Sequence, residues 1–198
     1  MDGSSTASGF DIVGMVSSAG GITALNAVLG RLPTDFPVPV LVVQHLDPRH
    51  RSLLAQILGR RTGLPVGEAE QGEKVRAGRI YVAAPDRHLL INKDGTVSLT
   101  ETELVHFTRP SADLLLESMA AAYGPRAIAV VLTGTGSDGA MGVTAIKKRG
   151  GTVIVQDEAS SEFFGMPSAA IRTGMVDFVL DLEEIATAVV TLVTGRAD

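Results

Sequence analysis

The sequence predicts an α/β fold: a doubly wound, mainly parallel sheet flanked by helices, with short antiparallel strands added in the middle of the chain. Short runs such as "FDIVGMV" (10–16) and "VPVLVVQH" (38–45) are apolar at nearly every position, as in strands buried on both faces. Helix-like segments alternate with these runs, and this alternation favours a parallel sheet. With 198 residues, of which 45% are hydrophobic, the chain is long enough to bury such a core.

The first half of the chain begins with a polar leader and two strand–helix units. Residues 1–9 are small and polar, so we expect a flexible leader there and a single domain over 10–198. The first apolar run is followed by a predicted helix over 22–32, whose large apolar residues fall on one face. A second predicted helix passes through 53–58 after the second run.

The middle of the chain has a different pattern. Between 66 and 100, short segments such as "RIYVAA", "HLLIN" and "TVSLT" are separated by turn residues, and we interpret them as short antiparallel strands in or beside the main sheet. A helix is predicted over 110–123, where an apolar stripe follows Pro and Ser. The alternation then resumes with strand "AIAVVLT", helix "GAMGVTAIKKRG", strand "TVIVQ", a short helix after "GMP", strand "VDFVL" and a last helix from Glu183.

Composition and charge exclude several classes of function. The net charge of -5 argues against nucleic acid or an anionic membrane surface as the main partner. The absence of cysteine excludes disulfides, thiolate chemistry and cysteine-ligated zinc. No apolar run approaches the roughly 20 residues of a membrane span, and the first residues do not form a secretory signal. We therefore expect a globular cytoplasmic protein without membrane insertion.

Polar loops follow three of the predicted strands. "SSAGG" follows the first strand, "QHLDP" the second and "TGTGSDGA" a later one. Because the carboxyl ends of parallel strands meet at one edge of the sheet, these loops can bring a serine, a histidine and an aspartate together. A serine hydroxyl becomes a nucleophile when a histidine takes its proton and a carboxylate orients that histidine. His45 and Asp138 are therefore candidates for the base and the orienting acid.

The glycine spacing favours Ser18 over Ser17 as the nucleophile. Small residues after a nucleophile let the backbone bend sharply and let other groups approach. Gly20 and Gly21 stand at the second and third positions after Ser18, whereas Ala19 is second after Ser17. Backbone N–H groups at this strand-to-helix turn would also be placed to support an oxyanion.

Purely structural roles are the alternatives at each of these positions. Ser18 also suits the N-cap of the following helix, and Asp138 suits the N-cap of the helix "GAMGVTAIKK". His45 is alternatively a partly buried histidine satisfied by the backbone. His88, in "PDRH", is a rival base whose setting between short strands favours a structural role or a place on the rim of the site.

A metal site is a further alternative in the loop after the second strand. "HLDPRH" places His45, Asp47 and His50 close together in the sequence. Zinc requires ligands in fixed geometry with supporting hydrogen bonds, which a strand end followed by a proline turn does not provide. We therefore predict no metal and no other cofactor.

The motifs taken together resemble a known family. In order, they are "SSAGG", "VVQHL", "RIYVAAPDRHLL", "RPSADLLLES", "VVLTGTGSDGAMG", "GGTVIVQDEASSEFFGMPSAAI" and "VDFVLDLEEI". Each motif is weak alone, but in this order, from Phe10 to Leu192, they are highly specific. The chain resembles the catalytic domain of bacterial chemotaxis receptor methylesterases, the protein-glutamate methylesterases of the CheB type.

The resemblance implies roles for individual residues. The family's nucleophile, a serine before a small residue and two glycines, corresponds to Ser18. Its histidine, in a Gln-His pair, corresponds to His45, and its aspartate, in the Asp-Gly pair of the TG-rich loop, corresponds to Asp138. The implied oxyanion and site-lining positions are Ala19, Gly20 and Thr135.

The resemblance also implies a reaction and partners. The family hydrolyses γ-glutamyl methyl esters on helical chemoreceptors, releasing methanol, and deamidates certain receptor glutamines. Methyl-accepting chemotaxis receptors are therefore the expected protein substrates. The family's regulated form also carries an N-terminal receiver domain, which is not present in this sequence. A separate receiver or regulatory protein is accordingly a candidate partner.

Three departures from the family pattern bear on the oxyanion geometry and the substrate fit. Val16 stands where the family usually has glycine, Ser17 where alanine is common, and Thr135 replaces a frequent methionine. Val16 is the main support for a second hypothesis, a catalytically weakened relative that serves as a regulatory or interaction protein. A third hypothesis, nucleotide binding at the first turn, is disfavoured because "SSAGG" lacks G-x-G-x-x-G spacing and no Walker lysine is present.

Overall fold

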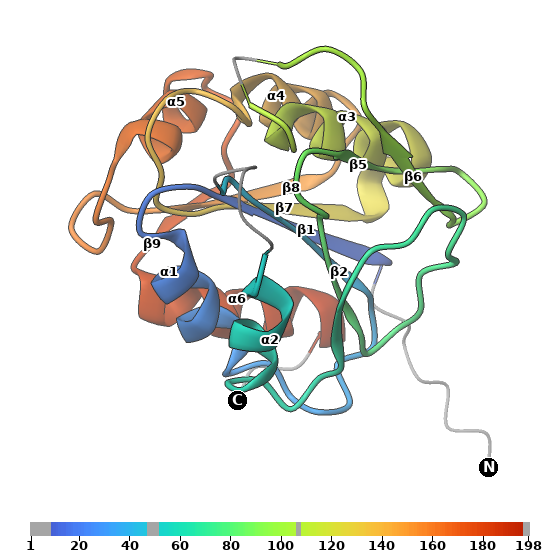
Figure 1. Ribbon diagram of the computed structural model, residues 1–198. Coiled ribbons are helices and arrows are strands. Elements are labelled where there is room, and N and C mark those ends of the chain that lie inside the picture. Colours follow the sequence, from blue (N-terminus) through green and yellow to red (C-terminus); the bar gives the residue numbers. More distant parts are fainter. Residues whose placement is uncertain (1–8, 47–51, 106–107, 196–198) are drawn as a thin grey trace.

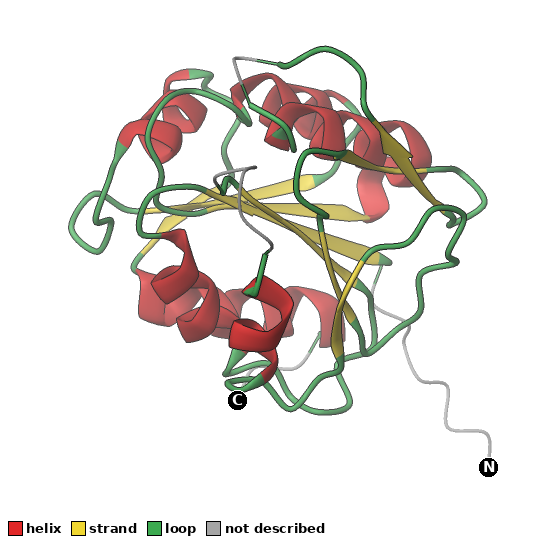
Figure 2. Cartoon of the chain, in the orientation of Figure 1, coloured by secondary structure: helices red, strands yellow, loops and turns green. Residues whose placement is uncertain are grey.

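A seven-stranded sheet crosses the molecule in the computed structural model, which describes residues 9–46, 52–105 and 108–195 (Figure 1). The strand order is β3-β4-β2-β1-β7-β8-β9, and every neighbouring pair is parallel. Nearly all of the leader expected over 1–9 lies outside the described residues. The strands, yellow in Figure 2, are β1 (Ile12–Ser17), β2 (Val40–Gln44), β3 (Val66–Glu68), β4 (Ile80–Val82), β7 (Ala127–Val131), β8 (Thr152–Gln156) and β9 (Phe178–Leu180).

Helices cover both faces of this sheet, as Figure 1 shows. One face is covered by α1 (Gly21–Leu29), α2 (Leu54–Gly59) and α6 (Leu182–Thr194). The other face is covered by α3 (Ala112–Tyr123), α4 (Ala140–Lys148) and α5 (Gly165–Arg172), with a single 3-10 turn, η1 (Gly124–Arg126), after α3.

The central strand β1 shows why the apolar runs are continuous. Val13 and Met15 pack on the side of α1, α2 and α6, whereas Ile12 and Val16 pack on the side of α3, α4 and α5. All four side chains are fully buried. A strand with helices on both faces needs apolar residues at successive positions, so the predicted doubly wound, mainly parallel fold is confirmed.

The predicted antiparallel strands are correct only in part. "HLLI" and "VSLT" form an antiparallel pair of their own, β5 (His88–Ile91) and β6 (Val97–Thr100). "RIYVAA" was expected to be antiparallel as well, but its strand β4 lies parallel between β2 and β3 in the main sheet. β4 has only three residues, and three apolar residues carry no periodicity that separates the two kinds of pairing.

Two further features bear on function. The strand order reverses beside β1, which has β2 on one side and β7 on the other. In open α/β sheets, the crevice beyond the carboxyl ends of the strands at such a reversal is where ligands bind. Among the helices in the described part of the chain, none has the length and hydrophobicity needed to cross a bilayer.

Candidate active site

A pocket lies where β1 and β2 end, beside the reversal of strand order. Its volume is about 400 Å³. It is lined by Ser18, Ala19, Gly20, Gly21, Ile22, Thr23, Gln44 and His45. Four of the predicted site residues, Ser18, Ala19, Gly20 and His45, are therefore in one pocket.

The two serines of the first loop lie in different environments. Ser17 is the last residue of β1; it is fully buried, and its hydroxyl donates to Gln44 Oε1 at 2.6 Å. Ser18 follows the strand and lines the pocket. Ser17 is thus held in the interior by its own hydrogen bond, whereas Ser18 is accessible to a substrate.

The turn after Ser18 is held by backbone contacts. The Ser18 N–H donates to the Thr133 carbonyl at 3.0 Å, and the Ser18 carbonyl accepts from the Gly21 N–H at 2.9 Å. Gly20 adopts a left-handed conformation (φ 75°) and is the N-cap of α1, and within the described residues no side chain caps this helix. The alternative in which Ser18 is a helix N-cap is therefore wrong.

Gln44, at the end of β2, joins the serine turn to the histidine. Its Nε2 donates to the Ser18 carbonyl at 2.8 Å and to the His45 carbonyl at 2.9 Å, while its Oε1 accepts the Ser17 hydroxyl. Sequence reasoning did not assign it a role. The available signal was a polar side chain that ends the apolar strand "VLVVQ", because a buried amide requires hydrogen-bond partners.

His45 and Asp138 come together although 93 positions separate them. The distance from His45 Nε2 to Asp138 Oδ2 is 2.8 Å, and the two side chains are 13% and 3% exposed. The His45 backbone N–H donates to the Ser17 carbonyl at 3.1 Å, which fixes the start of the loop after β2. The ring is thus bonded to a carboxylate, and the alternative of a histidine satisfied by the backbone is wrong.

The Asp138 carboxylate is surrounded by hydrogen-bond donors. Oδ2 accepts from the Ala112 N–H at 2.7 Å and from the Thr108 hydroxyl at 3.1 Å. Oδ1 accepts from the Asp113 N–H at 2.9 Å and from the Ser111 hydroxyl at 3.0 Å. The backbone donors belong to the first turn of α3, where unpaired N–H groups and the helix dipole favour an anion.

These contacts decide the charge of Asp138. Burial alone would raise its pKa, but the hydrogen bonds from His45 and from the N–H groups of Asp113 and Ala112 outweigh burial and lower the pKa to about 2. Asp138 is therefore ionised at neutral pH. A neutral His45 that bonds to this carboxylate must carry its proton on Nε2, which leaves Nδ1 unprotonated.

Asp138 does not cap the helix that follows it, contrary to the alternative considered from the sequence. Gly139 is the N-cap of α4, with a left-handed φ of 105°, and no side chain of its own segment caps the helix. The Val16 side chain packs against the same turn: its Cγ2 lies 3.6 Å from the position that a Cβ on Gly139 would take. The departure at Val16 therefore fills the core beneath the Asp138 turn.

The TG-rich loop after β7 contacts the serine through Gly134. A Cβ on Gly134 would lie 2.9 Å from Ser18 Cβ, too close for any residue but glycine. The buried Thr133 hydroxyl donates to the Ala19 carbonyl at 3.1 Å and accepts from the Phe163 N–H at 2.8 Å. Thr135, the predicted oxyanion position, follows directly and is exposed on the loop.

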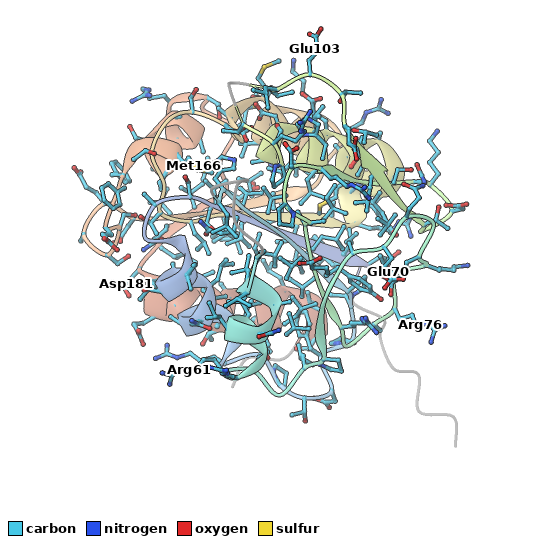
Figure 3. The ribbon with its side chains drawn as sticks, in the orientation of Figure 1. Arg61, Glu70, Arg76, Glu103, Met166 and Asp181 are labelled. Atoms are coloured by element: carbon cyan, nitrogen blue, oxygen red, sulfur yellow. The ribbon has the colours of Figure 1, made fainter. Side chains whose placement is uncertain are left out.

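His88 has a structural role. It is fully buried; its Nδ1 accepts from the Ser111 N–H at 3.1 Å, and its Nε2 donates to the Glu103 carbonyl at 3.0 Å. Glu103 lies on the loop at the top of Figure 3. Nδ1 thus supports the start of α3, and Nε2 holds the loop that precedes it.

The metal alternative is tested only in part. Within residues 9–46, 52–105 and 108–195, no group of three or more His, Cys, Asp or Glu side chains could hold a metal ion. Asp47 and His50 of that alternative lie outside the described residues.

Known proteins match this chain over most of its length. The family model described as CheB methylesterase matches residues 13–189. A relative from Leptospira interrogans is 43% identical over 88% of this chain and 91% of its own length. The protein-glutamate methylesterase/protein-glutamine glutaminase of Moorella thermoacetica is 41% identical over 94% of this chain but 45% of its own length. The crystal structure of the Thermotoga maritima CheB methylesterase catalytic domain matches with a TM-score of 0.89 and 38% identity, over 93% of this chain and 99% of that one.

Proposed function

Since the chain belongs to the CheB methylesterase family, we propose that it hydrolyses glutamate γ-methyl esters of chemoreceptors with Ser18, His45 and Asp138 as its catalytic triad. The observation that carries the proposal is the 2.8 Å hydrogen bond between His45 and an ionised, buried Asp138, beside a pocket that both Ser18 and His45 line. Serine hydrolysis requires a nucleophile beside a base that a carboxylate orients, and these two observations support that arrangement.

Proton transfer follows from the tautomer of His45. Asp138 accepts the Nε2–H proton, so Nδ1 is the nitrogen that takes the Ser18 proton. The imidazolium that forms is stabilised by a carboxylate that stays charged, because its pKa is about 2. Asp138 itself is not protonated in the reaction.

The reaction balances in two halves. Ser18 Oγ attacks the ester carbonyl while His45 takes its proton; the tetrahedral intermediate then expels methanol, which receives that proton, and leaves a γ-glutamyl ester on Ser18. In the second half, water attacks this acyl-enzyme with His45 as base, which frees the glutamate carboxylate and restores Ser18. A glutamine side chain would follow the same route with ammonia as the leaving group, which accounts for glutaminase activity.

Backbone donors would stabilise the oxyanion. The Ala19 N–H lies directly after the nucleophile, and the first turn of α1, which no described side chain caps, opens into the same pocket. Gly134 brings the TG-rich loop against Ser18, and Thr135 is the next residue of that loop. We assign Ala19, Gly20 and Thr135 to this part of the site.

The proposed substrates are methylated chemoreceptors, and a separate receiver or regulatory protein is the proposed source of control. A cytoplasmic location belongs to the same proposal. The name of the Moorella thermoacetica relative includes both activities, methylesterase and glutaminase. We expect both activities from one site.

The decisive experiment measures methanol release from a methylated chemoreceptor fragment by the wild type, Ser18→Ala and Ser17→Ala. Ser18→Ala should lower the rate by about 10⁴-fold to 10⁶-fold, since loss of a nucleophile removes the covalent route. Ser17→Ala is the matched control: it removes a buried hydrogen bond to Gln44 and should reduce stability by about 1 kcal/mol while turnover continues.

The outcomes separate the hypotheses. Equal methanol release by the wild type and Ser18→Ala would overturn the serine mechanism. No release by the wild type from several receptors would overturn the esterase proposal and favour the weakened relative with a regulatory role. Ammonia release from a glutamine-containing receptor, measured in the same variants, tests whether deamidation uses the same serine.

A further inference from the structure

The N-terminal segments of α3 and α4 are joined by two carboxylates, each of which accepts N–H groups of the other segment. Asp138, which precedes α4, accepts the N–H groups of Ala112 and Asp113 in the first turn of α3. Asp113, in that first turn of α3, accepts the Gly139 N–H at 2.9 Å and the Gly142 N–H at 2.8 Å in the first turn of α4. The N–H groups at the start of each helix are therefore bonded to a carboxylate from the segment that begins the other helix.

Asp113 is buried like the acid it contacts. Its exposed fraction is 2%, against 3% for Asp138. Two carboxylates at such depth are held by the N–H groups that each receives, because unpaired backbone donors and buried anions are both unfavourable alone. Neither the Ser-His-Asp pattern nor the mechanism above assigns Asp113 any function.

One of these hydrogen bonds holds Gly139, the residue next to the proposed catalytic acid Asp138. Gly139 follows Asp138 directly, and its left-handed φ of 105° turns the chain into α4. Asp113 binds that glycine's N–H through its carboxylate and binds Asp138 Oδ1 through its own N–H. The backbone and the side chain of position 138 are thus both tied to position 113.

We propose that Asp113 is a positioning residue of the esterase, which holds Asp138 at the place where it meets His45. This inference rests on the proposed function, in which Asp138 orients His45. The hydroxyl groups of Ser111 and Thr108 also donate hydrogen bonds to the Asp138 carboxylate, but Asp113 fixes the loop that carries it. Asp113 is not one of the residues that line the pocket, so Asp113 should affect turnover and leave substrate binding unchanged.

The test compares Asp113→Ala and Asp113→Asn with Met119→Ala. Asp113→Ala removes the acceptor for Gly139 and Gly142, and kcat should fall by about 10-fold to 100-fold, as expected when a catalytic group is misplaced by about 1 Å. KM for the methyl ester should stay within about 2-fold of wild type. Asp113→Asn keeps an acceptor oxygen and should recover most of kcat.

Met119→Ala is the structural control. Met119 is a fully buried residue of α3 that packs on Gly14 of β1, away from Asp138. It should lower the melting temperature without the kcat loss of Asp113→Ala. Adding Asp113→Ala to an Asp138→Ala background should change kcat no further, because the proposed effect passes through Asp138.

A second readout needs no substrate. The His45 Nε2–H proton bonded to Asp138 should give a separate downfield proton NMR signal, retained in Asp113→Asn and Met119→Ala and lost or shifted in Asp113→Ala. An unchanged signal in Asp113→Ala would overturn the inference even if the wild type proves to have no esterase activity. The two failures are therefore distinguishable.

The kinetic results that would overturn the inference are equally specific. They are a wild-type kcat in Asp113→Ala, a loss of kcat in Met119→Ala equal to that in Asp113→Ala, or a further loss in the Asp138→Ala background. If Asp113→Ala does not fold, Asp113→Glu replaces it. That variant keeps the charge but moves the carboxylate by one methylene, and a wild-type kcat with an unchanged His45 signal in it would overturn the inference too.

Discussion

The turns that precede α1 and α4 have similar backbones, but the surroundings of their N–H groups differ. Each follows a buried parallel strand, each has a left-handed glycine as N-cap, with φ of 75° at Gly20 and 105° at Gly139, and neither has a side-chain cap from its own segment. At α4, the N–H groups of Gly139 and Gly142 are taken by Asp113. At α1, the first turn lines the pocket beside Ser18.

The difference assigns the two turns opposite tasks. A helix N-terminus attracts an anion. At α4 the N–H groups of Gly139 and Gly142 are bonded to a carboxylate of the protein, and we call this the closed turn; in the proposed mechanism it fixes Asp138, the acid. No described side chain caps the turn at α1, which we call the open turn; in the proposed mechanism its N–H groups attract the negative charge that develops on the substrate. In this proposal, the same local sequence pattern, a strand followed by small residues and glycine, positions the acid at one turn and takes part in the reaction at the other.

Besides Ser18→Ala, the largest expected effect comes from the acid at the closed turn. Asp138→Asn should lower kcat by about 10⁴-fold. An uncharged amide does not hold the His45 Nε2–H as a carboxylate does, and it does not stabilise the imidazolium that forms in the reaction. Single-turnover rates with a methylated receptor fragment measure this loss. A decrease below about 10-fold would show that the histidine is oriented by other groups.

The same substitution has a signature in stability. The pKa of Asp138 is lowered from 3.8 to about 2 in the folded protein, so its stabilising contribution is present above about pH 4 and is lost as the pH falls towards 2. Urea unfolding of the wild type should show a component of about 2 kcal/mol lost over that range, which Asp138→Asn should lack. Ser18→Ala, at the open turn, is the control and should keep the wild-type pH dependence.

The open turn was easier to predict from the sequence than the closed one. Two glycines after Ser18 are a local signal. They favoured Ser18, which lines the pocket, over Ser17, which is buried. The continuous apolar strands likewise carry their own evidence of burial on both faces. In these places, the residues that determine the structure are neighbours in the sequence.

The closed turn could not be predicted because its contacts are not local. Adjacency suggests that Asp138 caps α4, yet the left-handed Gly139 turns the carboxylate towards α3, about 25 positions back. Asp113, Gln44 and Thr133 were missed for the same reason, since their partners lie on other strands and loops. The parallel pairing of β4 is also decided by its neighbours in the sheet.

A methyl group on Gly21 should disturb the open turn strongly. A Cβ there would lie 2.6 Å from Ser17 Oγ and would also meet Gln44 Oε1, two buried atoms that bond to each other. Gly21→Ala should reduce stability by about 1–3 kcal/mol. It should also lower kcat by about 10²-fold, because Gln44 holds the carbonyls of Ser18 and His45.

Gly59→Ala is the matched control for that substitution. Gly59 ends α2, and a Cβ there would make only ordinary contacts with Val66, at 3.8 Å and more. It should keep wild-type turnover and gain up to about 1 kcal/mol from the better helix propensity of alanine. Equal kinetics for Gly21→Ala and Gly59→Ala would mean that the position of Gln44 does not support the active site.

A charge added to the open turn should have opposite effects on stability and activity. Thr23 is exposed in the first turn of α1 and lines the pocket. Thr23→Glu should raise the unfolding free energy by about 0.3–1 kcal/mol, since a carboxylate suits a helix N-terminus. It should lower kcat/KM by about 3-fold to 5-fold, because the same charge opposes the oxyanion.

Thr23→Gln separates charge from size in that prediction. It should keep kcat/KM near the wild-type value and gain little stability. The effect of Thr23→Glu on kcat/KM should also shrink in high salt, since the charge is exposed to solvent. A loss of activity that is equal in both variants, or that salt does not change, would show that the first turn of α1 exerts no electrostatic effect on the reaction.

The smallest expected effect reports the negative charge of the closed turn itself. Glu117 lies one helical turn beyond Asp113, and burial raises its pKa, with further contributions from the charges of Asp113 and Asp138. A carboxyl group with a raised pKa destabilises the fold once it ionises, so the penalty is absent at low pH and grows as the pH rises through that pKa. Glu117→Gln should therefore raise the melting temperature at pH 7 but not at acidic pH, by an amount that corresponds to about 0.5 kcal/mol or less for a half-exposed side chain. The gain should shrink in an Asp113→Asn background, because one of the two charges that oppose Glu117 is gone. An undiminished gain would mean that the charge of Asp113 does not raise the pKa of Glu117.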